Sequence, residues 1–331
     1  MKLQKVKEIK KIYSVVKAQG KLIVSSTNKN IGYYNSDTLE LEQKLEDHIK
    51  ILNTFKFDSS IFYISTRNEL FRQDGGSISP FLKERIRLNV SQIKEHIVLY
   101  KGKVFNKEYS VYSLRLQKKI WGLNNIPLEI IESYCFQLDY TFFKARNIET
   151  GEILWSKTIT DDFPEATGYK FKTVYNKVLI IAINDTTLAG YHVDTGELLW
   201  SVNKTNNRNL LVDNDGKLKG VISTGYFETD IQTGIHRRIE FAPFEAIKEP
   251  GWFESQRDNF VIIDKHIITT DFYSNRIGGF NMETQQYDWF YTEENATGFP
   301  ASRPIKYFAP YLCLIDNNDT LHIYNLNNNI A

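Results

Sequence analysis

A seven-residue segment of the chain occurs twice, and this repeat constrains the fold more than any other feature. Thr150–Ser156 reads TGEILWS, and Thr195–Ser201 reads TGELLWS. Weaker copies of the same frame begin at Thr233 and at Thr284. A period of about 40–50 residues, built from short strands and tight turns, is typical of a β-propeller. The sequence therefore predicts an all-β propeller built from repeated blades.

Turn residues recur along the whole chain at the point where the third strand of a blade would pass to its fourth. Glycine in such a turn tolerates a positive φ. A tryptophan follows several of the turns, where a flat ring can pack between neighbouring blades. These markers predict eight four-stranded antiparallel blades of about 41 residues each, with seven blades as the alternative. The turns lie near Asp37, Asp74, Gln117, Glu149, Asp194, Gln232, Glu283 and Asn327, and the tryptophans are Trp121, Trp155, Trp200 and Trp289.

The two ends of the chain complete one another in this scheme. The last unit has strand-like segments at Tyr311–Ile315 and Leu321–Leu326 and then stops before a fourth strand. The segment Leu3–Ile9 precedes the first complete blade. We expect it to supply the missing strand of the last blade, because ring closure removes exposed sheet edges. Residues 1–331 are thus predicted to form a single propeller domain.

Composition excludes several classes of function. The 41 basic residues nearly cancel the 40 acidic ones, and a net charge of +1 argues against general nucleic-acid binding, which needs a basic field. No apolar run is long enough to span a membrane. The N-terminus lacks the apolar core of a signal peptide, which predicts a cytoplasmic protein unless a leader has been removed. Cys135 and Cys313 both lie in strand-like apolar runs, where each is expected to be a buried, free thiol.

The sequence offers no recognisable catalytic or metal-binding motif. Its six histidines are scattered without metal-ligand spacing, and neither a nucleophile elbow nor a phosphate-binding glycine loop occurs. We expect no cofactor, no metal and no catalysis. Enzymes on propellers need converging carboxylates or histidines; the carboxylates near the loops discussed next form no pattern that we recognise. They are Asp161, Asp162, Glu165, Glu254 and Glu293.

Three long loops join the outer strand of one blade to the inner strand of the next. They are predicted at residues 160–169, 241–258 and 292–303. Aromatic side chains on loops stiffened by proline suit a protein interface, because ordering them costs little entropy. The alternative is that these rings fold back and cover the ends of the blades. The candidate binding face consists of Phe163, Phe244, Trp252, Phe253 and Phe299.

A second candidate site is a set of basic residues at the entry to four consecutive inner strands. In the predicted register they would converge on the mouth of a central channel and attract a small anionic ligand or a sugar. The alternative is that each charge is solvated and individually paired. The residues are Lys170, Arg208, Arg257 and Arg303.

The turn and its tryptophan resemble the repeat of the pyrroloquinoline-quinone (PQQ)-like propeller family. The best copies are Glu149–Trp155 and Asp194–Trp200, and Gln232–Arg238 and Glu283–Trp289 are degenerate. The family includes quinoprotein dehydrogenases, non-enzymatic outer-membrane assembly lipoproteins and binding proteins. This chain is shorter than the enzymes and lacks their adjacent cysteines, so the resemblance implies the non-enzymatic branch and no PQQ.

These observations favour a non-catalytic scaffold that binds a protein through the long loops. One concrete form is a bacterial immunity-like protein, whose partner would be a toxin enzyme. The alternative is binding or processing of a small anionic ligand or sugar at the channel mouth.

Overall fold

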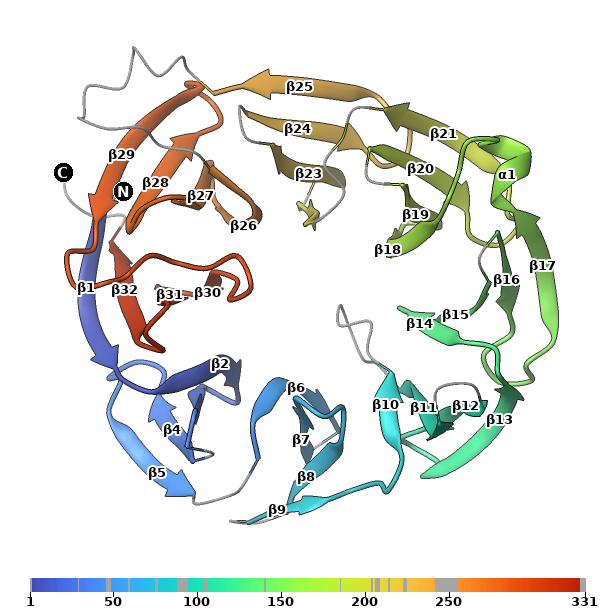
Figure 1. Ribbon diagram of the computed structural model, residues 1–331, viewed down its shortest axis with the longest axis horizontal. Helices are drawn as coiled ribbons and strands as arrows, with labels where there is room; N and C mark the ends of the chain where they lie inside the picture. The colour runs from blue at the N-terminus through green and yellow to red at the C-terminus, as the bar shows by residue number, and fades with distance from the viewer. Residues whose placement is uncertain are drawn as a thin grey trace. The chain divides into compact units, whose positions relative to one another are not determined.

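The computed structural model describes most of the chain and shows an all-β protein (Figure 1). The described residues are 2–28, 30–45, 49–58, 60–74, 77–87, 95–103, 106–139, 141–184, 186–203, 205, 209–213, 215–222, 225–241 and 255–327. Their strands form eight four-stranded antiparallel sheets. The predicted eight-bladed β-propeller is confirmed. Contacts within the chain define two compact units, which are described separately: unit 1 is Met1–Lys50, Thr205–Asp230 and Ile235–Ala331, and unit 2 is Ile51–Lys204 and Ile231–Gly234.

Unit 1 contains four of the sheets. Three of them follow the order of the chain, and the fourth combines the two ends of the chain. The sheets are β2 (Ile12–Ala18), β3 (Lys21–Ser26), β4 (Ile31–Asn35) and β5 (Leu41–Leu45); β22 (Leu211–Val212), β23 (Lys217–Ile222), β24 (Gly225–Asp230) and β25 (His236–Glu240); β26 (Ser255–Ile263), β27 (His266–Asp271), β28 (Arg276–Asn281) and β29 (Gln286–Thr292); and β30 (Lys306–Phe308), β31 (Tyr311–Ile315), β32 (Leu321–Asn327) and β1 (Lys2–Ile9).

Unit 2 contains the other four sheets, each in chain order, and a short helix. The helix α1 (Ile159–Asp162) has four residues, and no helix of the described chain is long and apolar enough to cross a membrane. The sheets are β6 (Ile51–Phe57), β7 (Ser60–Ser65), β8 (Leu70–Asp74) and β9 (Ser77–Pro80); β10 (Arg85–Arg87), β11 (His96–Lys103), β12 (Asn106–Ser113) and β13 (Lys118–Asn124); β14 (Leu128–Ile131), β15 (Tyr134–Leu138), β16 (Phe142–Arg146) and β17 (Ile153–Thr158); and β18 (Tyr169–Tyr175), β19 (Val178–Ile183), β20 (Thr187–His192) and β21 (Leu198–Asn203).

Burial differs between the strands of one blade, and the sequence follows it. The second strand β19 reads VLIIAI, and every residue of it is buried. A short continuous apolar run of this kind is typical of a strand covered on both faces. The fourth strand β21 is only partly buried, and Leu199 in it is 42% exposed.

The fourth strands that carry a tryptophan share a bulge one residue before the ring. In β17, Ala145 pairs with Trp155 and Arg146 pairs with Ile153, so Leu154 is the extra residue. The corresponding register shift occurs before Trp121, Trp200 and Trp289. A bulge bends its strand and redirects the next side chain. It therefore explains why Leu154 of the repeat is 56% exposed while the tryptophan beside it is packed.

The tryptophan and the turn glycine of the repeat meet between consecutive blades. The Trp155 Nε1 donates a hydrogen bond to the Val193 carbonyl over 2.8 Å. Gly196 has a φ of +74°, and a Cβ added there would lie 2.7 Å from the Trp155 ring. The pairs Trp121–Gly151 and Trp200–Gly234 have the same geometry. The prediction that these rings pack between neighbouring blades is confirmed for these three pairs.

The N-terminal strand closes the last blade of unit 1, as predicted. β1 pairs antiparallel with β32, from Lys2 opposite Asn327 to Ile9 opposite Leu321 (Figure 1). The core of this region combines residues from both ends of the chain, including Ile12, Leu22 and Ile323. The two ends of the sequence are therefore joined by hydrogen bonds and by apolar packing.

Candidate protein-binding site

Two aromatic side chains project from the loop that joins β27 to β28 in unit 1. Phe272 is 60% exposed and Tyr273 is 72% exposed. Their rings form an edge-to-face pair with centroids 4.9 Å apart. Large aromatic side chains exposed next to one another are uncommon on a surface that meets only water, and they are enriched at the centres of protein interfaces. This pair is the strongest candidate binding feature in the described residues.

A buried aspartate fixes the backbone of this loop. Asp271, 1% exposed, accepts hydrogen bonds from the Ser274 hydroxyl at 2.5 Å and from the Tyr273 backbone N–H at 3.3 Å. The Gln256 side-chain amide donates to the Asp271 carbonyl at 2.9 Å. A short loop closed in this way holds its two rings in place before any partner arrives, which lowers the entropy lost on binding.

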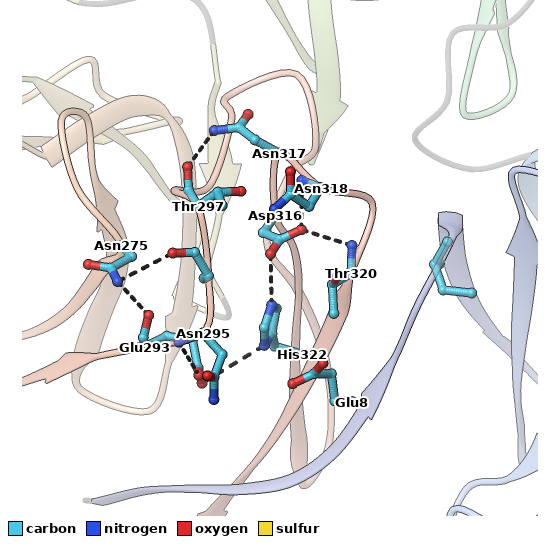
Figure 2. Close-up of polar contacts among 12 residues, drawn as sticks. Glu8, Asn275, Glu293, Asn295, Thr297, Asp316, Asn317, Asn318, Thr320 and His322 are labelled. Atoms are coloured by element: carbon cyan, nitrogen blue, oxygen red, sulfur yellow. Dashed lines mark hydrogen bonds and ion pairs between the residues drawn. The ribbon is translucent and has the colours of Figure 1, made fainter.

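The predicted long loop after β29 packs against the aromatic loop. The Asn275 Nδ2 donates to the carbonyls of Glu293 and Ala296, and the Glu293 N–H donates to the Asn275 carbonyl (Figure 2). The loop between β31 and β32 joins the same cluster, since the Asn317 Nδ2 donates to the Thr297 carbonyl at 2.9 Å. Hydrogen bonds therefore join three loops of unit 1, one of which carries Phe272 and Tyr273, and we call them the loop surface.

A buried network of charged groups includes Glu293, Asp316 and His322, which belong to or adjoin two of these loops (Figure 2). The Glu293 carboxylate, 2% exposed, accepts hydrogen bonds from the Tyr324 hydroxyl at 2.8 Å and from the Lys5 ammonium at 3.0 Å. His322 lies between two carboxylates: its Nε2 is 3.2 Å from Asp316 Oδ2, and its Nδ1 is 3.9 Å from Glu293 Oε2. Asp316 also accepts the backbone N–H groups of Asn318 and Thr320.

The centre of this network is closed to solvent, since His322 is 0% exposed and Asp316 is 1% exposed. Burial alone would raise the pKa of Glu293, but hydrogen bonds from Lys5 and Tyr324 hold this pKa below its ordinary value. Because Lys5 belongs to β1 and Glu293 follows β29, their ion pair ties the N-terminal strand to the loop surface.

The structure describes two of the predicted aromatic residues, one in each unit. Phe163 is half-buried and packs against a core cluster of unit 2, and Phe299 is 3% exposed in a core cluster of unit 1. Both rings therefore fold back against the blades, which was the alternative to an exposed binding face. Phe299 is not an exposed anchor. Phe244, Trp252 and Phe253 lie outside the described residues.

The structure describes the side chains of two of the predicted basic residues, one in each unit. Lys170 is exposed in unit 2. Arg303 forms an ion pair with Asp319 and hydrogen bonds to the carbonyls of Ile12 and Asp316. Its charge is thus individually paired, which was the alternative to a converging basic site. Arg208 lies outside the described residues, and so does the side chain of Arg257 in β26.

Among the remaining candidate carboxylates, Asp161 and Glu165 are exposed in unit 2, and Glu254 lies outside the described residues. Asp162 accepts hydrogen bonds from Tyr191 and Lys157. Cys135 and Cys313 are buried and free, as predicted, and burial raises the pKa of each thiol to about 12. Among the described residues, no group of three or more His, Cys, Asp or Glu side chains is placed to hold a metal ion.

Sequence reasoning missed Phe272 and Tyr273, although a signal for them was present. The segment from Asp271 to Asn275 reads DFYSN, in which an aspartate and a serine flank two aromatic residues between two apolar strands. Aspartate and serine at these positions favour a closed turn. Rings at the tip of such a turn have no strand beside them to pack against, so exposure follows.

Comparisons with known proteins support the fold class. No protein-family model matches the chain, and neither does any curated protein sequence. Among solved structures, yeast (Saccharomyces cerevisiae) Sqt1 matches with a TM-score of 0.65 and 10% identity, over 99% of this chain and 100% of that one. BamB from Moraxella catarrhalis matches with a TM-score of 0.60 and 13% identity, over 98% of this chain and 100% of its own. The computationally designed protein Ika8 matches with a TM-score of 0.62 and 10% identity, over 96% of each chain. The chain is thus a β-propeller with a PQQ-like structural neighbour in BamB, and identities this low show the fold alone.

Proposed function

We propose that this propeller is a non-catalytic scaffold that binds a protein partner through the loop surface of unit 1. The observation that carries the proposal is the pair Phe272 and Tyr273, exposed at 60% and 72% on a loop fixed by Asp271 and Asn275. Aromatic side chains of this kind supply most of the binding energy of many interfaces. The buried Glu293 network supports the loops and keeps the surface in one arrangement.

Partner capture with a matched variant tests the proposal. Full-length tagged protein, Phe272→Ala/Tyr273→Ala and Ile235→Ala are each used to recover partners from a lysate of the source cells. Ile235 is also 72% exposed but lies on the β24–β25 turn, away from the three loops. We expect one stoichiometric protein with the wild type and Ile235→Ala, and recovery reduced about tenfold or more with the double variant.

Stability separates loss of binding from loss of fold in this experiment. Both aromatic side chains are exposed, so we expect the free energy of unfolding of the double variant to lie within about 0.5 kcal/mol of the wild-type value. Equal recovery of the partner by the wild type and the stable double variant would overturn the proposed surface.

An immunity-like role is the finer form of the proposal. It requires that the captured partner be a toxin enzyme and that the purified propeller inhibit it in a stoichiometric mixture. A cytoplasmic location also stays a prediction of the sequence, and cell fractionation with an antibody against the chain tests it. Neither point is needed for the scaffold role itself.

A further inference from the structure

Unit 2 contains a cavity of about 520 Å³ at one end of two consecutive blades. Its walls come from three segments: residues 125–127 between β13 and β14, residues 138–139 at the end of β15, and residues 167–169 at the start of β18. A volume in this range is typical of a site for a small ligand or a single inserted side chain. None of these segments contributes to the loop surface of unit 1.

The cavity has an aliphatic wall and an acidic rim. Ile126, Pro127 and Leu138 supply the apolar lining, and Asp139 supplies a carboxylate. Tyr169 also lines the cavity, and its hydroxyl donates to the Phe142 carbonyl at 2.8 Å and accepts the Asp139 N–H at 3.3 Å. Asp139 is the charged residue among those that line the cavity.

The charge of the lining comes from Asp139. Burial, together with the charge of Asp139, raises the pKa of Tyr169 in the same wall. The adjacent Lys170 is not among the lining residues. The lining is thus acidic, opposite in sign to the site predicted for an anionic ligand.

We propose that this cavity binds a cationic group carried on an aliphatic stem, the chemistry of an arginine or lysine side chain. The carboxylate of Asp139 would accept charge-assisted hydrogen bonds from the guanidinium or ammonium group. Ile126, Pro127 and Leu138 would cover the methylene stem, as apolar walls do for long basic side chains.

A glycine in the wall allows the cavity to be filled without disturbing the fold. A Cβ added at Gly168 would meet no atom within 4 Å, and its backbone does not require a positive φ. The variant Gly168→Leu should therefore place its side chain into open space. Glu197→Gln is a matched control for loss of charge, because Glu197 is exposed on the β20–β21 turn of the same unit.

The test titrates the full chain with N-acetyl-L-arginine methylamide and with its neutral citrulline analogue, followed by NMR. We expect the arginine probe to bind the wild type and Glu197→Gln equally, and to bind Asp139→Asn about tenfold more weakly. Gly168→Leu should abolish the binding while its thermal unfolding stays that of the wild type. Equal binding of the citrulline probe, unchanged binding by a folded Gly168→Leu, or no binding to the wild type would each overturn the proposal.

A second probe distinguishes the source of the cation. Agmatine carries the same guanidinium without peptide groups. Tighter binding of the methylamide probe would assign the cavity to a side chain of a protein, and tighter binding of agmatine would assign it to a free amine. Because no partner protein is used, these results do not depend on the scaffold proposal.

Discussion

Trp155 and Trp289 occupy equivalent positions of their blades but differ in the hydrogen bonding of the indole N–H. Trp155 donates to the Val193 carbonyl of the next blade, and its ring lies against Gly196. Trp289 lies against Gly279 in the same way as Trp200 lies against Gly190, but its buried Nε1 has no hydrogen-bond partner among the residues that the structure describes. Trp289 precedes the blade that the two chain ends complete, where the third strand does not turn directly into a fourth.

This difference predicts unequal costs for the same substitution. Trp155→Phe removes a hydrogen bond and leaves the Val193 carbonyl without its donor. Trp289→Phe removes a donor for which the described part of the chain holds no acceptor. We expect Trp155→Phe to lower the free energy of unfolding by about 1 kcal/mol more than Trp289→Phe. Urea unfolding of the two variants measures this, and equal losses would contradict the role given to the indole hydrogen bond.

Glu129 predicts a pH dependence of stability. Burial raises its pKa to about 7, an effect that the charge of Arg87 partly opposes. The folded state therefore holds the Glu129 proton more tightly than the unfolded chain, whose glutamates titrate near 4.5, and the stability this provides is lost as pH rises from about 4.5 through 7. We expect Glu129→Gln to be more stable than the wild type at pH 8 by about 1–3 kcal/mol and nearly equal to it at pH 4, measured by urea unfolding. An equal difference at both pH values would rule out this titration.

At the scale of elements, β1 is the strand whose position depends on long-range contacts. It pairs with β32 along its length, and its Lys5 forms an ion pair at 3.0 Å with Glu293, 288 residues away in sequence. Glu293 is buried, so removal of its cation would leave an uncompensated charge inside the protein. The ion pair therefore couples closure of the last blade to the loop surface that carries Phe272 and Tyr273.

Lys5→Met tests this coupling. We expect the variant to lose about 2 kcal/mol of unfolding free energy at pH 7, and Lys5→Met/Glu293→Gln to recover most of the loss, because the buried charge is then gone. Lys10→Met, at an exposed lysine just beyond β1, is the control. Its free energy of unfolding should lie within about 0.5 kcal/mol of the wild-type value. Since Glu293 titrates below its ordinary value, the effect of Lys5→Met should shrink as pH falls below about 4.5. Equal stability of Lys5→Met and Lys10→Met at pH 7 would contradict the role of the ion pair.

At the scale of the whole molecule, the sequence predicted architecture far better than it predicted the site. The turn glycines and their tryptophans are local signals that mark the middle blades. The first blades could be inferred only from strand alternation, and the closing strand from the missing fourth strand of the last unit. The bulge before each ring and the link between Lys5 and Glu293 depend on three-dimensional register, which spacing does not encode. Phe299 was expected on a surface but is 3% exposed, because loops with prolines and aromatics can cover a core as readily as bind a partner.

Site-specific photo-crosslinking is the most direct test of the central claim that the three-loop surface binds a protein. A photoreactive phenylalanine analogue is placed at Tyr273 in one variant and at Ile235 in another, two positions that are each 72% exposed. We expect one crosslinked protein from position 273 in the source cells and none from position 235. The same products from both positions, or none from position 273, would contradict this claim.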